Sequence, residues 1–461
     1  MSMEIANTGN DPEAESPQPS ATDSKASGAS SARSGYEQQS QGQASQPRPH
    51  SLREHVGIAD IWRAYEVLRD RVHHTPILPS RTLSAMTGAK IMLKAENLQR
   101  SGSFKIRGAT YKMQRLTPAE RQRGVITASA GNHAQGVAIA AREAGVPCTI
   151  VMPADAPLAK VVATQGYGAT VVLHGADYDE AYEHCCELQR ETGARYIPAF
   201  DDPDIIAGQG TLGLEILSDL PDVDAIVVPV GGGGLISGVA IAAKALKPDI
   251  TIIGVQASGC GAVYASLKAH EIHRLPAINT IADGIAVKRP GDLTFAIIER
   301  YVDDVVLVDD EAIINAVLFL MERCKLLVEG AGAVGLAALL SGVIALPGKL
   351  IAVPLTGGNI DINLVSRFIQ HGLSATGRYL VIHTLLPDRP GQLLGLLRAI
   401  AAEGVNVLDI AHHRTGVRLP IQQVEVMLTL ETRDRAHCDR LLEVLRSQNY
   451  IVSEIRPTFV S

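Results

Sequence analysis

The sequence has few features of a secreted, metal-binding or membrane-spanning protein. Its six cysteines include no CxxC pair and no spacing typical of zinc ligands. We find no secretory signal, so we expect reduced thiols in a cytoplasmic protein. No apolar run reaches the roughly 18 residues of a membrane span, because the stretch 335–348 is interrupted by Ser341, Gly342 and Pro347. We therefore predict neither a disulfide framework nor a membrane segment.

Basic residues are in slight deficit. Lys and Arg number 42 against 49 Asp and Glu, which gives a formal net charge of −7. A chain without a basic excess is poorly suited to the phosphate backbone of nucleic acids, so we predict no nucleic-acid partner. Hydrophobic residues make up 46% of the 461 positions, enough for two or three domains with cores of their own.

Residues 1–50 have few large apolar side chains. They are rich in Ser, Gln, Gly, Ala and Pro, and Tyr36 is their only aromatic residue. Such a segment cannot bury enough apolar surface to offset the entropy lost on ordering, so we predict a disordered tail. The acidic residues Asp11, Glu13 and Glu15 argue against a transit peptide.

Residues 51–376 alternate short apolar runs with amphipathic stretches. The apolar runs are 148–152, 169–173, 225–230, 251–256 and 350–355, and helical patterns such as 133–145 and 235–246 lie between them. Continuous apolar strands separated by helices are typical of parallel sheets covered on both faces. We therefore predict a large α/β domain whose ligand lies at the carboxyl ends of the strands.

The pattern changes in residues 377–461. Strand-like segments at 379–386, 405–415, 424–432 and 450–455 are separated by helix-like segments at 393–404 and 433–448. The order is therefore β, α, β, β, α, β, which is typical of a ferredoxin-like domain. We expect a linker near Gly377 to join it to the α/β domain.

Two loops contain candidate cofactor residues. In SGSFKIRGA (101–109), Lys105 follows Phe104, and by itself it is most simply interpreted as a solvated charge. GGGGL (231–235) follows a strand and opens a helix, so its backbone amides can surround a phosphate. The alternative is a tight turn, but a turn needs only one or two glycines, and we favour phosphate binding.

Two more loops follow apolar strands. Amides within SAGNHAQG (129–136) can hold a carboxylate at the start of the next helix. Taken alone, Asn132 is explained equally well as a helix N-cap, and His133 better as a residue of the helix surface. TGGN (356–359) brings the Thr356 hydroxyl to another strand end, although it also suits an ordinary turn.

Two further segments resemble ligand-binding motifs, but we predict no ligand at either of them. GAGAVG (330–335) matches GxGxxG, but a helical segment at 311–328 precedes it and no acidic residue follows at the required distance. We expect close helix packing there and no dinucleotide. HEIH (270–273) lacks a third metal ligand, so we expect solvated helix residues rather than zinc. We predict no metal site.

The loops together provide a lysine, an asparagine, a phosphate cradle and a hydroxyl at the ends of separate strands. A phosphorylated carbonyl cofactor that binds lysine uses such a set. Pyridoxal 5′-phosphate is therefore the favoured hypothesis.

These motifs, with AGQGT (207–211), ADGIAVKRPG (282–291) and EGAGA (329–333), occur in the order seen in threonine dehydratases (threonine ammonia-lyases). Over about 55–375 the chain resembles the tryptophan-synthase-β-like, fold type II pyridoxal-phosphate enzymes, which have two parallel-sheet α/β subdomains. The segment around DRPGQLLGLL (388–397) resembles one ACT domain, an amino-acid-sensing fold.

The resemblance implies roles for these residues. Lys105 forms the Schiff base beside Phe104, and its freed amine acts as general base. Asn132 bonds the cofactor 3-hydroxyl, Thr356 faces the pyridine nitrogen where relatives often have serine, and Glu329 lies near the ring. The implied phosphate-binding residues are Gly231, Gly232, Gly233, Gly234 and Leu235. The implied seat of the substrate carboxylate is formed by Ser129, Ala130, Gly131, Asn132 and His133.

The implied reaction converts L-threonine to 2-oxobutanoate and ammonia, in isoleucine biosynthesis or threonine catabolism, and we expect L-serine to react as well. The alternatives are a serine-preferring dehydratase, a racemase, and a catalytically idle sensor that works through its ACT domain. Ala130 stands where related serine racemases have a second serine, which argues against a racemase. The lysine, the glycine run and Thr356 argue against an idle sensor.

Two further expectations follow from the resemblance. Relatives with a divalent metal have carboxylates near the positions of Ser258 and Tyr264, so the resemblance implies no metal here. Its single ACT domain makes feedback by an amino acid plausible, and the sequence leaves open whether isoleucine, valine or another effector binds. Because ACT domains usually pair, we expect a homodimer or homotetramer.

Overall fold

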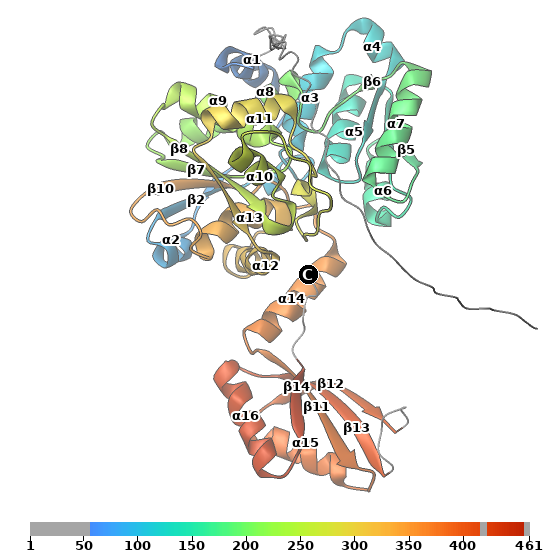
Figure 1. Ribbon diagram of the computed structural model, residues 1–461, viewed down its shortest axis with the longest axis vertical. Coiled ribbons are helices and arrows are strands. Elements are labelled where there is room, and N and C mark those ends of the chain that lie inside the picture. The colour runs from blue at the N-terminus through green and yellow to red at the C-terminus, as the bar shows by residue number, and fades with distance from the viewer. Residues whose placement is uncertain (1–55, 415–421, 456–461) are drawn as a thin grey trace, which may run out of the picture. The chain divides into compact units, whose positions relative to one another are not determined.

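The computed structural model describes residues 56–414 and 422–455. The prediction of a disordered tail at 1–50 lies outside these residues. The described chain forms three sheets, two of them in the predicted α/β region and one in the predicted small domain (Figure 1). No helix among the described residues is long and apolar enough to cross a membrane.

The larger α/β subdomain is built on a six-stranded sheet in the order β1-β2-β10-β7-β8-β9. All neighbours pair in parallel except β1 with β2. The strands are β1 (Ile77–Pro79), β2 (Lys90–Lys94), β7 (Ala225–Pro229), β8 (Thr251–Ala257), β9 (Asp304–Val308) and β10 (Leu350–Pro354). The helices are α1 (Ile58–Leu68), α2 (Arg81–Thr87), α8 (Pro203–Asp219), α9 (Gly234–Leu246), α10 (Ala262–Ala269), α11 (Asp292–Tyr301), α12 (Asp310–Phe319), α13 (Gly330–Leu340) and α14 (Ile362–Ala375), with single turns η1 (Glu96–Leu98), η2 (Ser258–Cys260), η3 (Asp283–Ile285) and η4 (Leu320–Cys324).

Strand β7 shows why the strands of this sheet are continuous apolar runs in the sequence. Ala225 and Val227 pack into one hydrophobic cluster with α12 and α13. Ile226 and Val228 pack into another with α8 and α9. Alternate side chains of one strand therefore enter cores on opposite faces, as expected of a parallel sheet covered on both sides.

The smaller α/β subdomain has a parallel four-stranded sheet in the order β5-β4-β3-β6. Its strands are β3 (Val125–Ala128), β4 (Cys148–Met152), β5 (Thr170–Leu173) and β6 (Arg195–Tyr196). Its helices are α3 (Lys105–Arg115), α4 (Pro118–Arg123), α5 (Asn132–Ala144), α6 (Leu158–Gly166) and α7 (Tyr178–Thr192), several of which lie beside this sheet in Figure 1. The predicted strand bounds agree with the structure to within one residue here.

The ACT-like region has the predicted βαββαβ order. Its elements are β11 (Tyr379–Pro387), α15 (Gln392–Ala402), β12 (Asn406–His413), β13 (Gln423–Glu431), α16 (Arg435–Ser447) and β14 (Val452–Ile455). The sheet order is β12-β13-β11-β14 with antiparallel neighbours. This is the ferredoxin-like arrangement, so the fold prediction is confirmed.

Two predicted helices end earlier than the sequence indicated. The segment 311–328 was predicted to be helical throughout, but after α12 and η4 the chain turns at Lys325, which has φ +60°. Glu329 then donates its backbone N–H to the Gly357 carbonyl at 3.0 Å. Likewise α10 ends at Ala269, so HEIH lies in an exposed loop rather than in a helix. Pairing with distant segments overrides local helix propensity at 325–329.

The GAGAVG motif packs closely, as predicted. It opens α13, and a Cβ on Gly332 would come within 2.8 Å of the Gly357 carbonyl oxygen. A Cβ on Gly335 would lie 3.1 Å from the Val227 carbonyl oxygen. The glycines therefore let α13 approach a loop and a strand more closely than larger residues allow.

Candidate active site

A cavity of about 960 Å³ is lined by residues of both α/β subdomains. It receives the loops that follow β3, β7 and β10, together with the start of α3. All the predicted site residues line it: Phe104, Lys105, Ser129, Ala130, Gly131, Asn132, His133, Gly231, Gly232, Gly233, Gly234, Leu235 and Thr356. The carboxyl ends of parallel strands thus meet at one site, as expected for this kind of sheet.

Lys105 is the first residue of α3 and projects its amine into this cavity. Its Nζ donates a hydrogen bond to the Ala199 carbonyl at 2.9 Å and lies 5.2 Å from the centre of the Phe104 ring. Burial lowers the pKa of Lys105 to about 8, although the nearby Glu329 carboxylate opposes this change. A lysine with this pKa is partly neutral near physiological pH, so it can act as a nucleophile and a base.

The glycine run between β7 and α9 offers unpaired backbone donors. Among the residues that the structure describes, no acceptor is found for the amides of residues 231–235. Gly233 has φ +98°, and a Cβ on Gly232 or Gly234 would collide with Phe200. Free amides at the start of a helix attract an anion, so this loop suits a phosphate group.

Asn132 lies at the start of α5 but does not cap it. Gly131 is the N-cap residue, and the Asn132 side chain instead bonds to distant residues. Its Nδ2 donates to Glu329 Oε1 at 2.6 Å, and its Oδ1 accepts from Asn359 Nδ2 at 2.8 Å. The N-cap interpretation is therefore wrong. These bonds, which cross about 200 residues of sequence, orient the Asn132 amide in the cavity.

His133 is buried rather than on a helix surface, so the prediction from the local pattern is wrong. Its Nε2 lies 3.0 Å from the Ile197 carbonyl oxygen, which requires a proton on Nε2. Burial, with a contribution from the Lys105 charge, lowers the pKa of His133 to about 3. The imidazole is therefore neutral across the physiological range. It is among the buried residues of α5.

Glu329, which the resemblance places near the cofactor ring, has a carboxylate whose charge acts on Lys105. It is 5% exposed and precedes α13. Burial raises the pKa of Glu329 to about 7 and the Asp283 charge adds to this effect, while the Asn132 hydrogen bond opposes it. Its charge therefore changes in the range where Lys105 also titrates.

The loop after β10 is bonded to the residues that precede Lys105. The Phe104 amide donates to the Thr356 carbonyl oxygen at 3.1 Å, and Ser103 and Gly357 form a β-bridge. The Thr356 side chain is 3% exposed and lines the cavity, and its hydroxyl has no partner among the described residues. A hydroxyl in this state can bond one ligand atom.

The seat predicted for a carboxylate also has free donors. Asn132 and His133 are the first two residues of α5, and neither backbone amide has an acceptor within residues 56–414 and 422–455. Gly131 donates its amide to the Ser129 hydroxyl oxygen at 3.2 Å. Ala130 contributes no polar side-chain atom.

Sequence reasoning missed the ion pairs at the edge of the cavity. Lys160 of α6 lies 2.8 Å from Asp283, and Asp179 of α7 lies 2.7 Å from Lys288 and 3.3 Å from Arg274. Each pair joins the smaller subdomain to the 270–291 segment of the larger one. Their separations in sequence exceed 90 residues, so no local signal identifies them.

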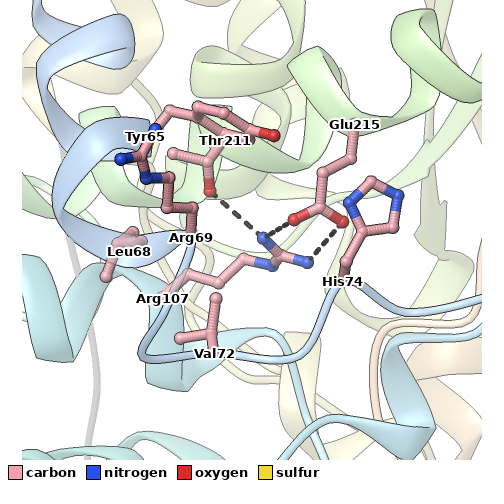
Figure 2. Close-up of a pocket in the computed structure, with 8 residues that line it drawn as sticks. All are labelled: Tyr65, Leu68, Arg69, Val72, His74, Arg107, Thr211 and Glu215. Carbon is pink, nitrogen blue, oxygen red and sulfur yellow. Dashed lines mark hydrogen bonds and ion pairs between the residues drawn. The ribbon is translucent and has the colours of Figure 1, made fainter.

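Arg107, to which the sequence assigned no role, lies in a separate buried cluster. Figure 2 shows its guanidinium bonded to Thr211 and Glu215 of α8. Glu96 contacts it at 2.8 Å, and the arginine side chain is 0% exposed. The adjoining cavity of about 30 Å³ holds no more than about one water molecule. This cluster is therefore structural and too small for a cofactor.

The chain belongs to the family of pyridoxal-phosphate dependent enzymes, whose sequence pattern matches residues 68–357, and residues 380–448 match the ACT domain. The L-threonine ammonia-lyase of Thermotoga maritima is 49% identical over 397 residues, which cover 86% of this chain and 99% of that protein. The predicted resemblance and fold class are thereby confirmed.

Solved structures agree with this assignment. The processed form of threonine deaminase isoform 2 from Solanum lycopersicum is 38% identical with a TM-score of 0.65, over 68% of this chain and 91% of that one. Maize serine racemase is 39% identical with a TM-score of 0.66, over 69% and 98%. The protein is a pyridoxal-phosphate-dependent enzyme, as predicted.

The cavity has the donors that this cofactor requires. A lysine amine, free amides at 231–235 and an unpartnered hydroxyl at Thr356 match its aldehyde, phosphate and ring nitrogen. No group of three or more His, Cys, Asp or Glu side chains in the described part of the chain is arranged to hold a metal ion.

Proposed function

We propose that the protein is a threonine ammonia-lyase. It converts L-threonine to 2-oxobutanoate and ammonia, and acts on L-serine as a second substrate. The observation that most supports this is the Lys105 amine, which has no carboxylate partner among the described residues and faces the same cavity as the free amides of 231–235. The 49% identity to the Thermotoga maritima L-threonine ammonia-lyase supports the choice of substrate.

In this proposal the four loops hold the cofactor. Lys105 would bind it covalently, and Phe104 would lie beside its ring. Asn132 would bond its 3-hydroxyl, and Thr356 would bond its ring nitrogen. The phosphate is bound by Gly231, Gly232, Gly233, Gly234 and Leu235. The cofactor, when bound, supplies the electron-withdrawing system that makes the substrate α-proton acidic and allows the β-hydroxyl to leave.

The residues at the start of α5 orient the substrate. Ser129, Ala130 and Gly131, with the amides of Asn132 and His133, hold its carboxylate. Free amides at a helix N-terminus favour a carboxylate, because they combine hydrogen bonds with the positive end of the helix dipole. Fixing the carboxylate directs the α-proton toward Lys105.

Lys105 moves the proton. When its amine is not bonded to the cofactor, Lys105 would remove the substrate α-proton as general base. A pKa of about 8 leaves part of the amine unprotonated at neutral pH. The Ala199 carbonyl, 2.9 Å away, accepts a hydrogen bond from the amine in either protonation state and keeps it in the cavity.

We further propose that residues 51–376 form the catalytic domain and residues 377–461 an ACT regulatory domain that binds an amino-acid effector such as isoleucine or valine. We also propose a homodimer or homotetramer in the cytoplasm. The ferredoxin-like topology supports the ACT assignment. Light scattering of the purified protein measures the oligomeric state.

The decisive experiment measures 2-oxo-acid production from L-threonine and from L-serine, each with and without isoleucine. We expect product from both substrates, with threonine preferred, and a change in rate on addition of the effector. A faster reaction with serine would favour the serine dehydratase instead. Absence of product from both would favour a sensor that works through its ACT domain.

A further inference from the structure

The glycine run is held from behind by a buried threonine. Thr294 of α11 is 0% exposed, and its hydroxyl donates to the Gly232 carbonyl oxygen at 2.7 Å. The Gly291 amide contacts the same oxygen at 3.4 Å, which is a much weaker interaction. Thr294 does not line the cavity, so it contacts neither cofactor nor substrate. Its hydrogen bond is nevertheless made to the peptide group that carries one of the predicted phosphate donors, the Gly233 amide.

The geometry of a trans peptide explains why this bond matters. The carbonyl of Gly232 and the amide of Gly233 belong to one planar unit and point in opposite directions. Because the carbonyl is directed at Thr294, the Gly233 N–H is directed away from α11. That N–H has no acceptor among the residues described. Gly233 has φ +98°, a conformation that residues with a Cβ rarely adopt. Because glycine has no Cβ, its own backbone does little to restrict the orientation of this peptide.

Thr294 is in turn held by Asp201. The Asp201 carboxylate accepts hydrogen bonds at 3.1 Å from the backbone amides of Asp292, Leu293 and Thr294, the first three residues of α11. The next residue in the chain before it, Phe200, packs against Gly232 and Gly234. The segment that contains Asp201 therefore restrains the glycine run both directly and through α11.

We propose that Thr294 is a positioning residue for the cofactor phosphate. Its hydroxyl fixes the Gly232–Gly233 peptide so that the Gly233 amide is directed at the phosphate, and Asp201 keeps Thr294 in register by capping α11. This inference rests on the proposed phosphate site at 231–235. It predicts that Thr294 affects binding of the phosphate group specifically, and not the reaction of the aldehyde with Lys105.

The test compares two cofactors on the full-length apoprotein. Thr294→Val has nearly the same shape and lacks the hydroxyl. We expect it to raise the Kd for pyridoxal phosphate about fivefold to tenfold, the effect of one buried hydrogen bond. We expect the Kd for pyridoxal, which has no phosphate, to change less than about twofold, and the ³¹P resonance of the bound cofactor to shift. Thr294→Ser restores the hydroxyl and the affinity.

A matched control is available in the ACT-like region. The Thr432 hydroxyl also donates to a glycine carbonyl, that of Gly377, at 2.7 Å, and the residue is buried. Thr432→Val removes a similar bond far from residues 231–235 in sequence, so it leaves both Kd values unchanged. Asp201→Asn weakens the cap of α11 without removing Thr294. Asp201 also lines the cavity, where loss of its negative charge alone would favour the phosphate, so a loss of affinity reports the weakened cap. We expect about a threefold loss for pyridoxal phosphate alone.

Two outcomes overturn the proposal. In one, Thr294→Val and Asp201→Asn bind pyridoxal phosphate as tightly as wild type. In the other, they lose affinity for pyridoxal and pyridoxal phosphate equally, which indicates a general structural role. If Thr294→Val does not fold, the cofactor comparison on Asp201→Asn decides. Failure of the wild-type protein to bind cofactor, or to form a 2-oxo acid from threonine, tests the proposed function separately.

Discussion

Lys105 and Arg107 are two cations in the first turn of α3, and their surroundings are opposite. Arg107 is enclosed with two carboxylates, Glu96 and Glu215, and forms hydrogen bonds with both. Lys105 has only the Ala199 carbonyl as a hydrogen-bond acceptor among the described residues. Burial opposes the charge at both positions. At Arg107 the two carboxylates outweigh burial and hold the pKa above its ordinary value, whereas at Lys105 burial prevails.

The difference shows how one helical turn serves both stability and chemistry. A buried cation with matched anions is costly to disrupt but unreactive. A buried amine without an ion-pair partner is unfavourable for folding, yet its lowered pKa makes it reactive. Arg107 therefore holds the first turn of α3 against η1 and α8. Lys105 lies in the same turn, so its position is fixed by the same bonds.

The largest expected effect is the loss of the reactive amine. In the proposed function Lys105 is both the covalent link to the cofactor and the general base, so we expect Lys105→Ala to lower kcat by a factor of about 10⁴ or more. Absorbance spectroscopy should show loss of the visible band of the lysine-bound cofactor. Lys105→Arg keeps a cation and should be equally inactive. Persistence of the band in Lys105→Ala would refute the lysine assignment.

The next effect is on stability rather than on chemistry. Arg107→Met leaves Glu96 and Glu215 buried without their cation, and we expect a loss of about 3–5 kcal/mol in the free energy of unfolding. Urea unfolding followed by fluorescence measures it. Arg100→Met, which removes a partly exposed arginine paired with Glu143, is the matched control and should cost less than about 1 kcal/mol. Equal losses would show that burial of the ion pair is irrelevant.

Glu329→Gln removes the carboxylate whose charge acts on Lys105, and it should change how stability depends on pH. The pKa of Glu329 is about 7 when folded and 4.5 when exposed, so the folded state binds more protons in this window. Its stability contribution is complete below pH 4.5 and is lost as pH rises to 7. We therefore expect the glutamine apoprotein to be more stable than wild type by about 3 kcal/mol at pH 8.5, and close to it at pH 4.5.

The same variant has a kinetic consequence. The Glu329 carboxylate raises the pKa of Lys105, so its removal should lower that pKa further. The acidic limb of the kcat profile, which reports the substrate complex in which the amine is free, should then move to lower pH. A profile that moves to higher pH, or a variant less stable at pH 8.5, would contradict the proposed coupling of these two groups.

The smallest effect is expected at His133. With a pKa of about 3, its imidazole stays neutral between pH 5 and 9. His133→Asn removes the imidazole bond to the Ile197 carbonyl and should reduce kcat/KM by less than about tenfold. The shape of the pH profile should not change. Disappearance of one limb in His133→Asn would assign to the histidine a titration that we attribute to Lys105 and Glu329.

Much of the architecture was predictable because it depends on local pattern. The apolar run CTIVM became β4 with the same bounds, and the glycine run became the loop between β7 and α9. The side-chain environments were less predictable. Asn132 was mistaken for a possible N-cap because its partners, Glu329 and Asn359, lie about 200 residues away.

His133 and Arg107 show the same limit. Both are polar residues at the start of helices, where exposure is the ordinary expectation. His133 is buried because the 197–200 segment covers it, and Arg107 because α8 and η1 close over it. Neither covering segment is adjacent in sequence, so no local signal indicates burial.

The sequence by itself determined the alternation of strands and helices, the position of a lysine at a helix start, and a run of glycines able to bind phosphate. These depend on periodicity, on backbone freedom and on residue chemistry, all of which are local. Only the tertiary structure decided that the pKa of Lys105 is lowered and that of Arg107 is raised. The pKa of each depends on burial and on carboxylates contributed by distant segments, because electrostatic energies follow distance in space rather than along the chain.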